Sequence, residues 1–268
     1  MVSSSSEGAD AMFIPLKDYN PTRRIAIVTI LFILLNFAVF IYQSYLSDEY
    51  QQNPLHASDL QPLAWPSSLE YFVVKDGLIP RELTGGQNVG IPVGKDRWGH
   101  AVIFNRQTSP LLSLLLSIFM HGSWLHLLGN MLFLWIFGNN VEDRLGSFTF
   151  IIFYLLCGIG ASLTHVLFNL NSLIPVIGAS GAVSGVMGAY LLLFPNARIR
   201  TLVFIFILFT TMDIPAAVFL VIWFVFQFFY AGGGAGIAWL AHVGGFILGM
   251  LLLRVFRGRK RPQLEAQS

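Results

Sequence analysis

The C-terminal half of the sequence carries almost no charge. Between Leu145 and Leu253 the charged side chains are Arg198, Arg200 and Asp213. Charged residues make up 11% of the whole chain, against about 25% in an ordinary globular protein. A water-soluble domain needs polar side chains to cover its surface. Because this segment has too few of them, we interpret the chain as a membrane protein.

Net charge and cysteine content exclude several other classes of function. The net charge is +2 and no basic stripe accompanies it, which argues against a nucleic-acid-binding protein. Cys157 is the one cysteine in the sequence, so neither a disulfide framework nor a cysteine-based metal site is expected. We expect no cofactor, no metal ion and no nucleic-acid partner.

Long apolar stretches predict the fold class. A helix needs about 20 mostly apolar residues to cross a bilayer, and the sequence predicts an all-α polytopic membrane protein, a bundle of six transmembrane helices. The predicted spans are residues 25–46, 123–138, 148–168, 177–194, 201–229 and 237–255. Residues 47–122 are predicted to form a large first outer loop, in which residues 111–120 form a short interfacial helix.

Basic residues predict the orientation of the chain. Eleven Lys and Arg residues flank the predicted spans on one side, and the other five lie in the long loop. Since basic residues favour the cytoplasmic side, both termini are predicted to be cytoplasmic. The predicted organisation is a cytoplasmic tail at residues 1–24, a membrane domain at 25–256 and a basic cytoplasmic tail at 257–268. We interpret residues 1–20 as a disordered tail.

Four polar side chains lie at similar depths in the even-numbered spans: His126, Asn130, Ser180 and His242. Each lies three to seven residues from the start of its span, or roughly 5–10 Å below the outer surface at the helical rise. Polar side chains inside a membrane mark functional sites. A serine becomes a nucleophile when a histidine takes its proton, and Asn and His side chains can donate to an oxyanion.

The same residues also have ordinary structural explanations. A serine in a membrane helix often bonds its own backbone, and Asn130 can simply join helices. His165 is expected at the outer interface. Asp213 and the histidines together suggest a proton relay in a transporter, but the sequence shows no inverted repeat. We interpret Asp213 as the cap of a helix break near Pro215 rather than as a catalytic group.

Glycines predict where the fourth and sixth spans approach each other. Small residues four positions apart let two helix backbones come close together. These pairs are Gly181 with Gly185 and Gly245 with Gly249. Gly178 and Gly181 also flank Ser180 and leave space for a substrate backbone.

Four motifs, in this order along the chain, resemble those of rhomboid intramembrane serine proteases. They are His121-x4-His126-x3-Asn130, Glu142-Asp143-Arg144, Gly178-Ala179-Ser180-Gly181, and Ala241-His242 followed by Gly245 and Gly249. The resemblance covers residues 121–249, and the flanking segments agree with a six-span bacterial form. Four motifs in order and in matching spans are a specific signal.

The resemblance implies an activity and the residues that perform it. Ser180 would be the nucleophile and His242 its general base, in a dyad without an acid. His126, Asn130 and the backbone amide of Ser180 would form the oxyanion hole. The substrates would be single-span membrane proteins, cut within the lipid bilayer near the outer face of the plasma membrane. The alternative is an inactive rhomboid-like protein that binds membrane helices without cutting them.

Further implications concern the supporting structure. Glu142 and Arg144 would hold the cytoplasmic end of the second span, and the fifth span would be a mobile gate.

The chain departs from the family pattern at two places. Leu112-Ser113 stand where many members have a Trp-Arg pair that anchors the loop, and Ser184 stands where many have an aromatic residue against which the histidine stacks.

Overall fold

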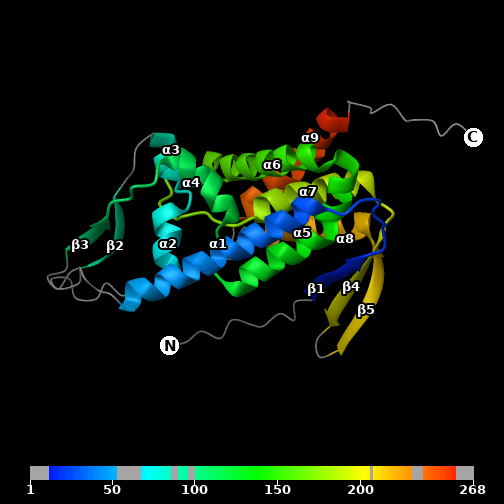
Figure 1. Cartoon of the computed structure of the whole chain (residues 1–268), viewed down its shortest axis with the longest axis horizontal. Coiled ribbons are helices and arrows are strands. Elements are labelled where there is room, and N and C mark those ends of the chain that lie inside the picture. The colour runs from blue at the N-terminus through cyan, green and yellow to red at the C-terminus, as the bar shows by residue number, and fades with distance from the viewer. Residues whose placement is uncertain are drawn as a thin grey trace, which may run out of the picture.

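The computed structural model describes residues 12–52, 68–85, 90–95, 100–205, 208–230 and 238–257. A bundle of helices carries two small antiparallel sheets, one at each end (Figure 1). The helices are α1 (Ile27–Gln52), α2 (Ser68–Asp76), α3 (Pro80–Gly85), α4 (Pro110–Leu116), α5 (Trp124–Leu145), α6 (Ser147–Leu167), α7 (Ser180–Leu193), α8 (Ala216–Tyr230) and α9 (Trp239–Arg257), with a 3-10 turn at Ser117–Phe119. The strands are β1 (Met12–Asp18), β2 (Ile91–Lys95), β3 (Ala101–Phe104), β4 (Arg198–Ile205) and β5 (Leu208–Pro215).

Several of these helices can cross a membrane. Within the described residues, α1, α6 and α9 contain stretches long and apolar enough to do so. A fourth span results if Pro110–Phe119 and α5, which meet at a bend of 76°, count as one broken span. Helices α7 and α8 are apolar but shorter. The described residues therefore contain three or four candidate spans, and six spans stay a prediction.

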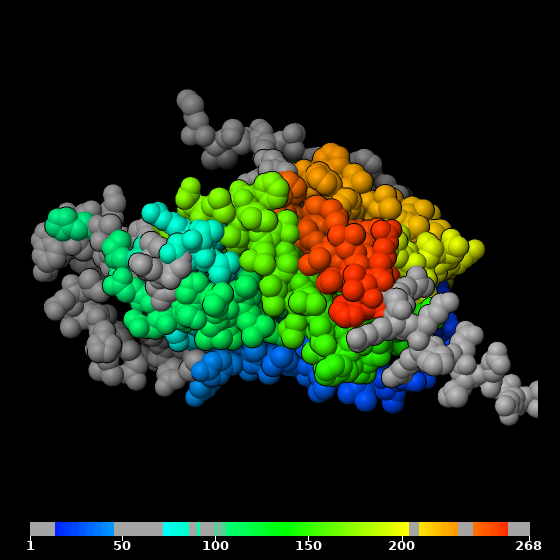
Figure 2. Space-filling model, turned by 90° about the horizontal axis from the view of Figure 1, so that it is seen from above, coloured from blue at the N-terminus to red at the C-terminus, as the bar shows by residue number. Residues whose placement is uncertain are grey.

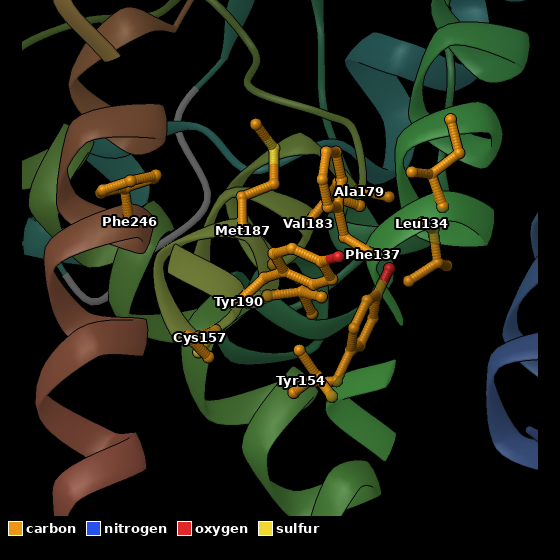
Figure 3. Close-up of a cluster of buried hydrophobic side chains, with 14 of the residues drawn as sticks. Leu134, Phe137, Tyr154, Cys157, Ala179, Val183, Met187, Tyr190 and Phe246 are labelled. Carbon is orange, nitrogen blue, oxygen red and sulfur yellow. The ribbon is translucent and has the colours of Figure 1, made fainter. Parts of the chain in front are cut away.

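Helix α7 lies at the centre of the bundle. Every residue from 181 to 190 is buried. Its side chains meet those of α5, α6 and α9 in one apolar cluster (Figure 3). The labelled members are Leu134, Phe137, Tyr154, Cys157, Ala179, Val183, Met187, Tyr190 and Phe246. Lipid tails are as apolar as these side chains, so close packing rather than escape from lipid must hold the cluster together.

The backbones of α7 and α9 touch at glycines. A Cβ atom added to Gly245 would overlap the carbonyl oxygen of Gly181, and one added to Gly249 would overlap that of Gly185. No residue with a side chain fits at these positions unless the helices move apart. The two glycine pairs in the sequence thus lie at one helix–helix contact.

The predicted fifth span, residues 201–229, is wrong in its first part, and so is the all-α class. Strands β4 and β5 form a hairpin, and α8 begins only at Ala216. Ile199, Thr201 and Val203 are buried while Arg198 and Arg200 are exposed. This alternation, with many β-branched residues, is typical of a strand. Average hydropathy alone does not distinguish such a strand from a helix.

Asp213 lies on β5 and not inside a membrane helix. Its carboxylate accepts a hydrogen bond of 3.0 Å from Nε of Arg200, directly across the hairpin. This bond holds the pKa of Asp213 below its ordinary value. Both side chains are partly exposed. The interpretation of Asp213 as a helix cap is therefore wrong, and its place on β5 also argues against the alternative of a proton relay within the bundle.

The predicted disordered tail is wrong for its second part. Residues 12–18 form β1, which pairs antiparallel with β4. Asp18 accepts hydrogen bonds from Tyr190 Oη at 2.9 Å and from Asn140 Nδ2 at 2.6 Å. The N-terminal segment thereby ties the ends of α5 and α7 together. Residues 1–11 lie outside the described part of the chain.

The predicted outer loop is folded where the structure describes it. The side chain of Arg106 is buried and pairs with the buried carboxylate of Glu82. Its Nη2 donates to the Gly77 carbonyl at 2.6 Å and to the Ser113 hydroxyl at 2.9 Å. Ser113, which stands in place of the Trp-Arg pair, thus accepts from an arginine elsewhere in the loop.

Candidate active site

The first turns of three helices meet at the end of the bundle near α3. Ser180 is the first residue of α7, and His242 lies in the first turn of α9. His126 lies in the first turn of α5. The segment before Ser180 runs beside this end, since Val176 exchanges backbone hydrogen bonds with Leu78. Residues that are far apart in sequence are thereby collected at one depth in the bundle.

Ser180 and His242 form a hydrogen bond across two helices. The distance from Ser180 Oγ to His242 Nε2 is 2.8 Å. At this distance an unprotonated ring nitrogen can take the proton of the hydroxyl group. The glycine contacts between α7 and α9 bring these two side chains within reach.

Gly178 holds the turn that presents Ser180. Its φ of 122° is in a region that favours glycine, and an added Cβ would lie 2.8 Å from the His126 ring. Its N–H donates to the Ser117 carbonyl at 2.8 Å. A side chain at this position would strain the backbone and displace His126. The loop segment and the serine are therefore positioned together.

His126 and Asn130 lie one turn apart on α5, contact His121, and line the same cavity as Ser180. The amide nitrogen of Asn130 is 2.9 Å from Nε2 of His121, and the His121 and His126 rings meet edge to face at 5.0 Å. His121 thus holds one hydrogen of the Asn130 amide. A side-chain amide has two hydrogens, which leaves the other for a ligand.

A cavity of about 960 Å³ opens beside the serine and histidine. It is lined by His126, Asn130, His165, Ser180, Trp223 and His242, among others. His165, expected at the interface, is thus one of the lining residues. The cavity is large enough for a segment of peptide.

Two residues from α8 contact the histidine, and neither was singled out from the sequence. Gln227 Oε1 is 2.7 Å from His242 Nδ1, and the Trp223 ring centre is 6.1 Å from that of His242. Ser184, in place of an aromatic residue, instead donates to the Ser180 carbonyl at 2.6 Å. The available signal for Gln227 was an amide in the otherwise apolar helix α8.

Glu142 and Arg144 lie near the far end of α5. The buried carboxylate of Glu142 accepts from the backbone amides of Val28 and Thr29, at 3.0 and 2.7 Å. It therefore caps the start of α1, where backbone amides lack helical partners. Ser147 Oγ donates to it as well. Arg144 is exposed and takes no part in these bonds.

Comparison with known proteins gives a consistent match. Residues 108–259 match a family model described as Rhomboid domain. Rhomboid protein 1, mitochondrial, of Saccharomyces cerevisiae is 34% identical over 151 residues, which are 52% of this chain and 40% of that protein. RHOMBOID-like protein 4 of Arabidopsis thaliana is 30% identical over 224 residues, 82% of this chain and 50% of that protein.

A bacterial protein also matches. Rhomboid protease GluP of Bacillus subtilis is 42% identical over 78 residues, 29% of this chain and 15% of that protein. The chain spans half or less of the length of each of these three relatives. Similarity thus extends to mitochondrial, plant and bacterial proteins.

Proposed function

Because the chain belongs to the rhomboid family, which makes it a polytopic helical membrane protein, we propose that it is an intramembrane serine endopeptidase. Ser180 is the nucleophile and His242 the general base. The observation that carries this proposal is the 2.8 Å hydrogen bond between Ser180 Oγ and His242 Nε2, at the edge of a large cavity. Such a pair has the geometry that serine activation needs.

The reaction follows from this geometry. Ser180 Oγ attacks the scissile carbonyl carbon, and its proton passes to Nε2 of His242. The carbonyl electron pair moves to oxygen, where the backbone amide of Ser180, Asn130 and His126 donate hydrogen bonds. The tetrahedral species collapses as the C–N bond breaks, and His242 protonates the leaving amine. Water then attacks the acyl-enzyme in the same way and releases Ser180.

The oxyanion donors supply a prediction of their own. Asn130→Ala and His126→Ala should each lower kcat by about 100-fold with little change in KM, because an oxyanion donor acts mainly in the transition state. Leu128→Ala, on the exposed side of the same turn of α5, is the matched control. Steady-state cleavage of one substrate by the purified variants measures both constants. Unchanged turnover in the Asn130/His126 double variant would contradict this assignment.

We infer the substrate class from the depth of the site. With both termini cytoplasmic, the helix that begins at Ser180 begins in the outer part of the membrane. The scissile bond must therefore reach that depth. A transmembrane helix hides its carbonyls in hydrogen bonds, and the serine needs extended backbone. Good substrates are therefore single-span plasma-membrane proteins with Gly, Pro or polar residues in the outer part of the span, where unwinding costs least.

Cleavage of such a substrate tests the proposal. The protein is reconstituted with a single-span substrate, and mass spectrometry locates the cut. We expect a cut in the outer part of the span, which weakens when the outer Gly and Pro residues are replaced by leucine. Binding of the substrate without cleavage by the wild type, together with no labelling of Ser180 by a fluorophosphonate, would favour the inactive membrane-helix binder instead.

A further inference from the structure

Gln227 is a buried polar residue in an apolar helix. It exposes 3% of its surface. Most other residues of α8 are apolar, and some of them, such as Phe229 with 72% of its surface exposed, face outward. Helices α8 and α9 lie side by side, in orange and red in Figure 2. Burying an amide inside a membrane bundle is costly unless its polar atoms find partners. Both polar atoms of Gln227 have one.

The hydrogen bonds of Gln227 determine how its amide group is oriented. Nε2 donates to the backbone carbonyl of Trp223 at 3.0 Å, and a carbonyl oxygen can only accept. The amide oxygen must therefore face His242, where Oε1 lies 2.7 Å from Nδ1. Because that oxygen is an acceptor, Nδ1 must carry a hydrogen.

The tautomer of the histidine follows. A neutral imidazole has a single N–H, so a hydrogen on Nδ1 leaves Nε2 with a free electron pair. Nε2 is the nitrogen that lies 2.8 Å from Ser180 Oγ. The opposite tautomer would point an N–H at the hydroxyl and could not take its proton.

We propose that Gln227 is the positioning residue that sets the tautomer and ring orientation of His242. This inference rests on the proposed function. Gln227 takes the orienting role that an acidic residue has in a Ser-His-Asp triad, but with a neutral amide that suits a membrane interior. The ring of Trp223, which lies on α8 like Gln227, has its centre 6.1 Å from that of the His242 ring and is tilted by 37° to it. The base is thus oriented by α8 and not by residue 184.

The first arm of the test removes the acceptor and then restores it. Gln227→Met keeps the length of the side chain but not its acceptor, and should lower kcat by about 100-fold, a typical loss for a misplaced catalytic group, with KM unchanged. Gln227→Glu keeps an acceptor oxygen at the same place, and its kcat should be at least tenfold higher than that of Gln227→Met. Val225→Met puts the same new side chain on the exposed face of α8 and should match the wild type.

The rate of fluorophosphonate labelling of Ser180 separates the two proposals. An unlabelled wild type would refute the proposed protease and not the contact made by Gln227. If the wild type is labelled, and Gln227→Met is labelled and turns over substrate at the same rates as the wild type, the role of Gln227 is refuted. Equal losses in Gln227→Met and Gln227→Glu, both folded, would also contradict it, because packing alone would then explain them.

A second measurement needs no variant of Gln227. Nitrogen NMR of the wild type labelled with ¹⁵N-histidine, with the His242 signals identified by their loss in His242→Ala, reports which ring nitrogen carries the hydrogen. We expect the hydrogen on Nδ1. A hydrogen on Nε2 would overturn the inference even if Gln227→Met fails to fold.

Discussion

Ser180→Ala and His242→Ala are each expected to abolish cleavage, with a loss of about 10⁴-fold or more. Without the Oγ atom no acyl-enzyme forms, and without the ring nitrogen nothing takes the hydroxyl proton at 2.8 Å. The two residues act as one unit, so the double variant should be no worse than either single one. Initial rates of product formation by purified variants at equal concentration measure the loss.

Two control variants show that the loss is chemical. Ser44→Ala removes a hydroxyl that bonds the Phe40 carbonyl of its own helix, and His100→Ala removes an exposed histidine. Both should retain wild-type turnover, and all four variants should melt near the wild-type temperature. Substantial cleavage by folded Ser180→Ala would contradict the proposed mechanism.

Much of the candidate site could be predicted from the sequence because its members start helices. Position along a helix translates directly into depth at a constant rise per residue. The starts of three spans therefore put His126, Ser180 and His242 at one level. Glycine spacing predicted which helices approach closely. Together these patterns predicted a meeting of side chains that the structure places 2.8 Å apart.

Gln227 could not be paired with His242 in this way. Its depth can be estimated, but a contact also depends on how α8 is rotated about its axis and which helix it packs against. An apolar helix in lipid has no polar face to indicate that rotation. The pair between Arg106 and Glu82 was missed for a related reason, because an irregular loop has no period from which to infer contacts.

The hairpin of β4 and β5 was missed because its central residues are apolar on both faces. In the structure, exposed and buried positions alternate near Arg198 and Arg200. In the sequence, however, the run from 202 to 209 carries no polar residue. Apolar runs of this kind fit a strand or a buried helix equally well by periodicity. Strand β1 depends on that hairpin for its partner, so it was missed as well.

Gly245→Leu is expected to disable Ser180 from the opposite helix. A Cβ at this position overlaps the carbonyl oxygen of Gly181, the residue after Ser180. Since a backbone oxygen cannot move aside as a side chain can, α9 must separate from α7. His242 lies one turn before Gly245 on α9 and moves with it. We expect loss of fluorophosphonate labelling and a loss of stability of about 3 kcal/mol.

A graded series isolates the effect of the helix contact. Gly245→Ala introduces the overlapping Cβ alone and should give a smaller loss of labelling and of melting temperature than leucine. Ile247→Leu, two residues along α9 with a 46% exposed side chain, creates the same leucine facing outward and should behave as the wild type. Labelling and thermal melting are measured in the same detergent for all variants. A stable and fully labelled Gly245→Leu protein would mean that α7 and α9 do not touch at these glycines, and the route by which His242 reaches Ser180 would have to be different.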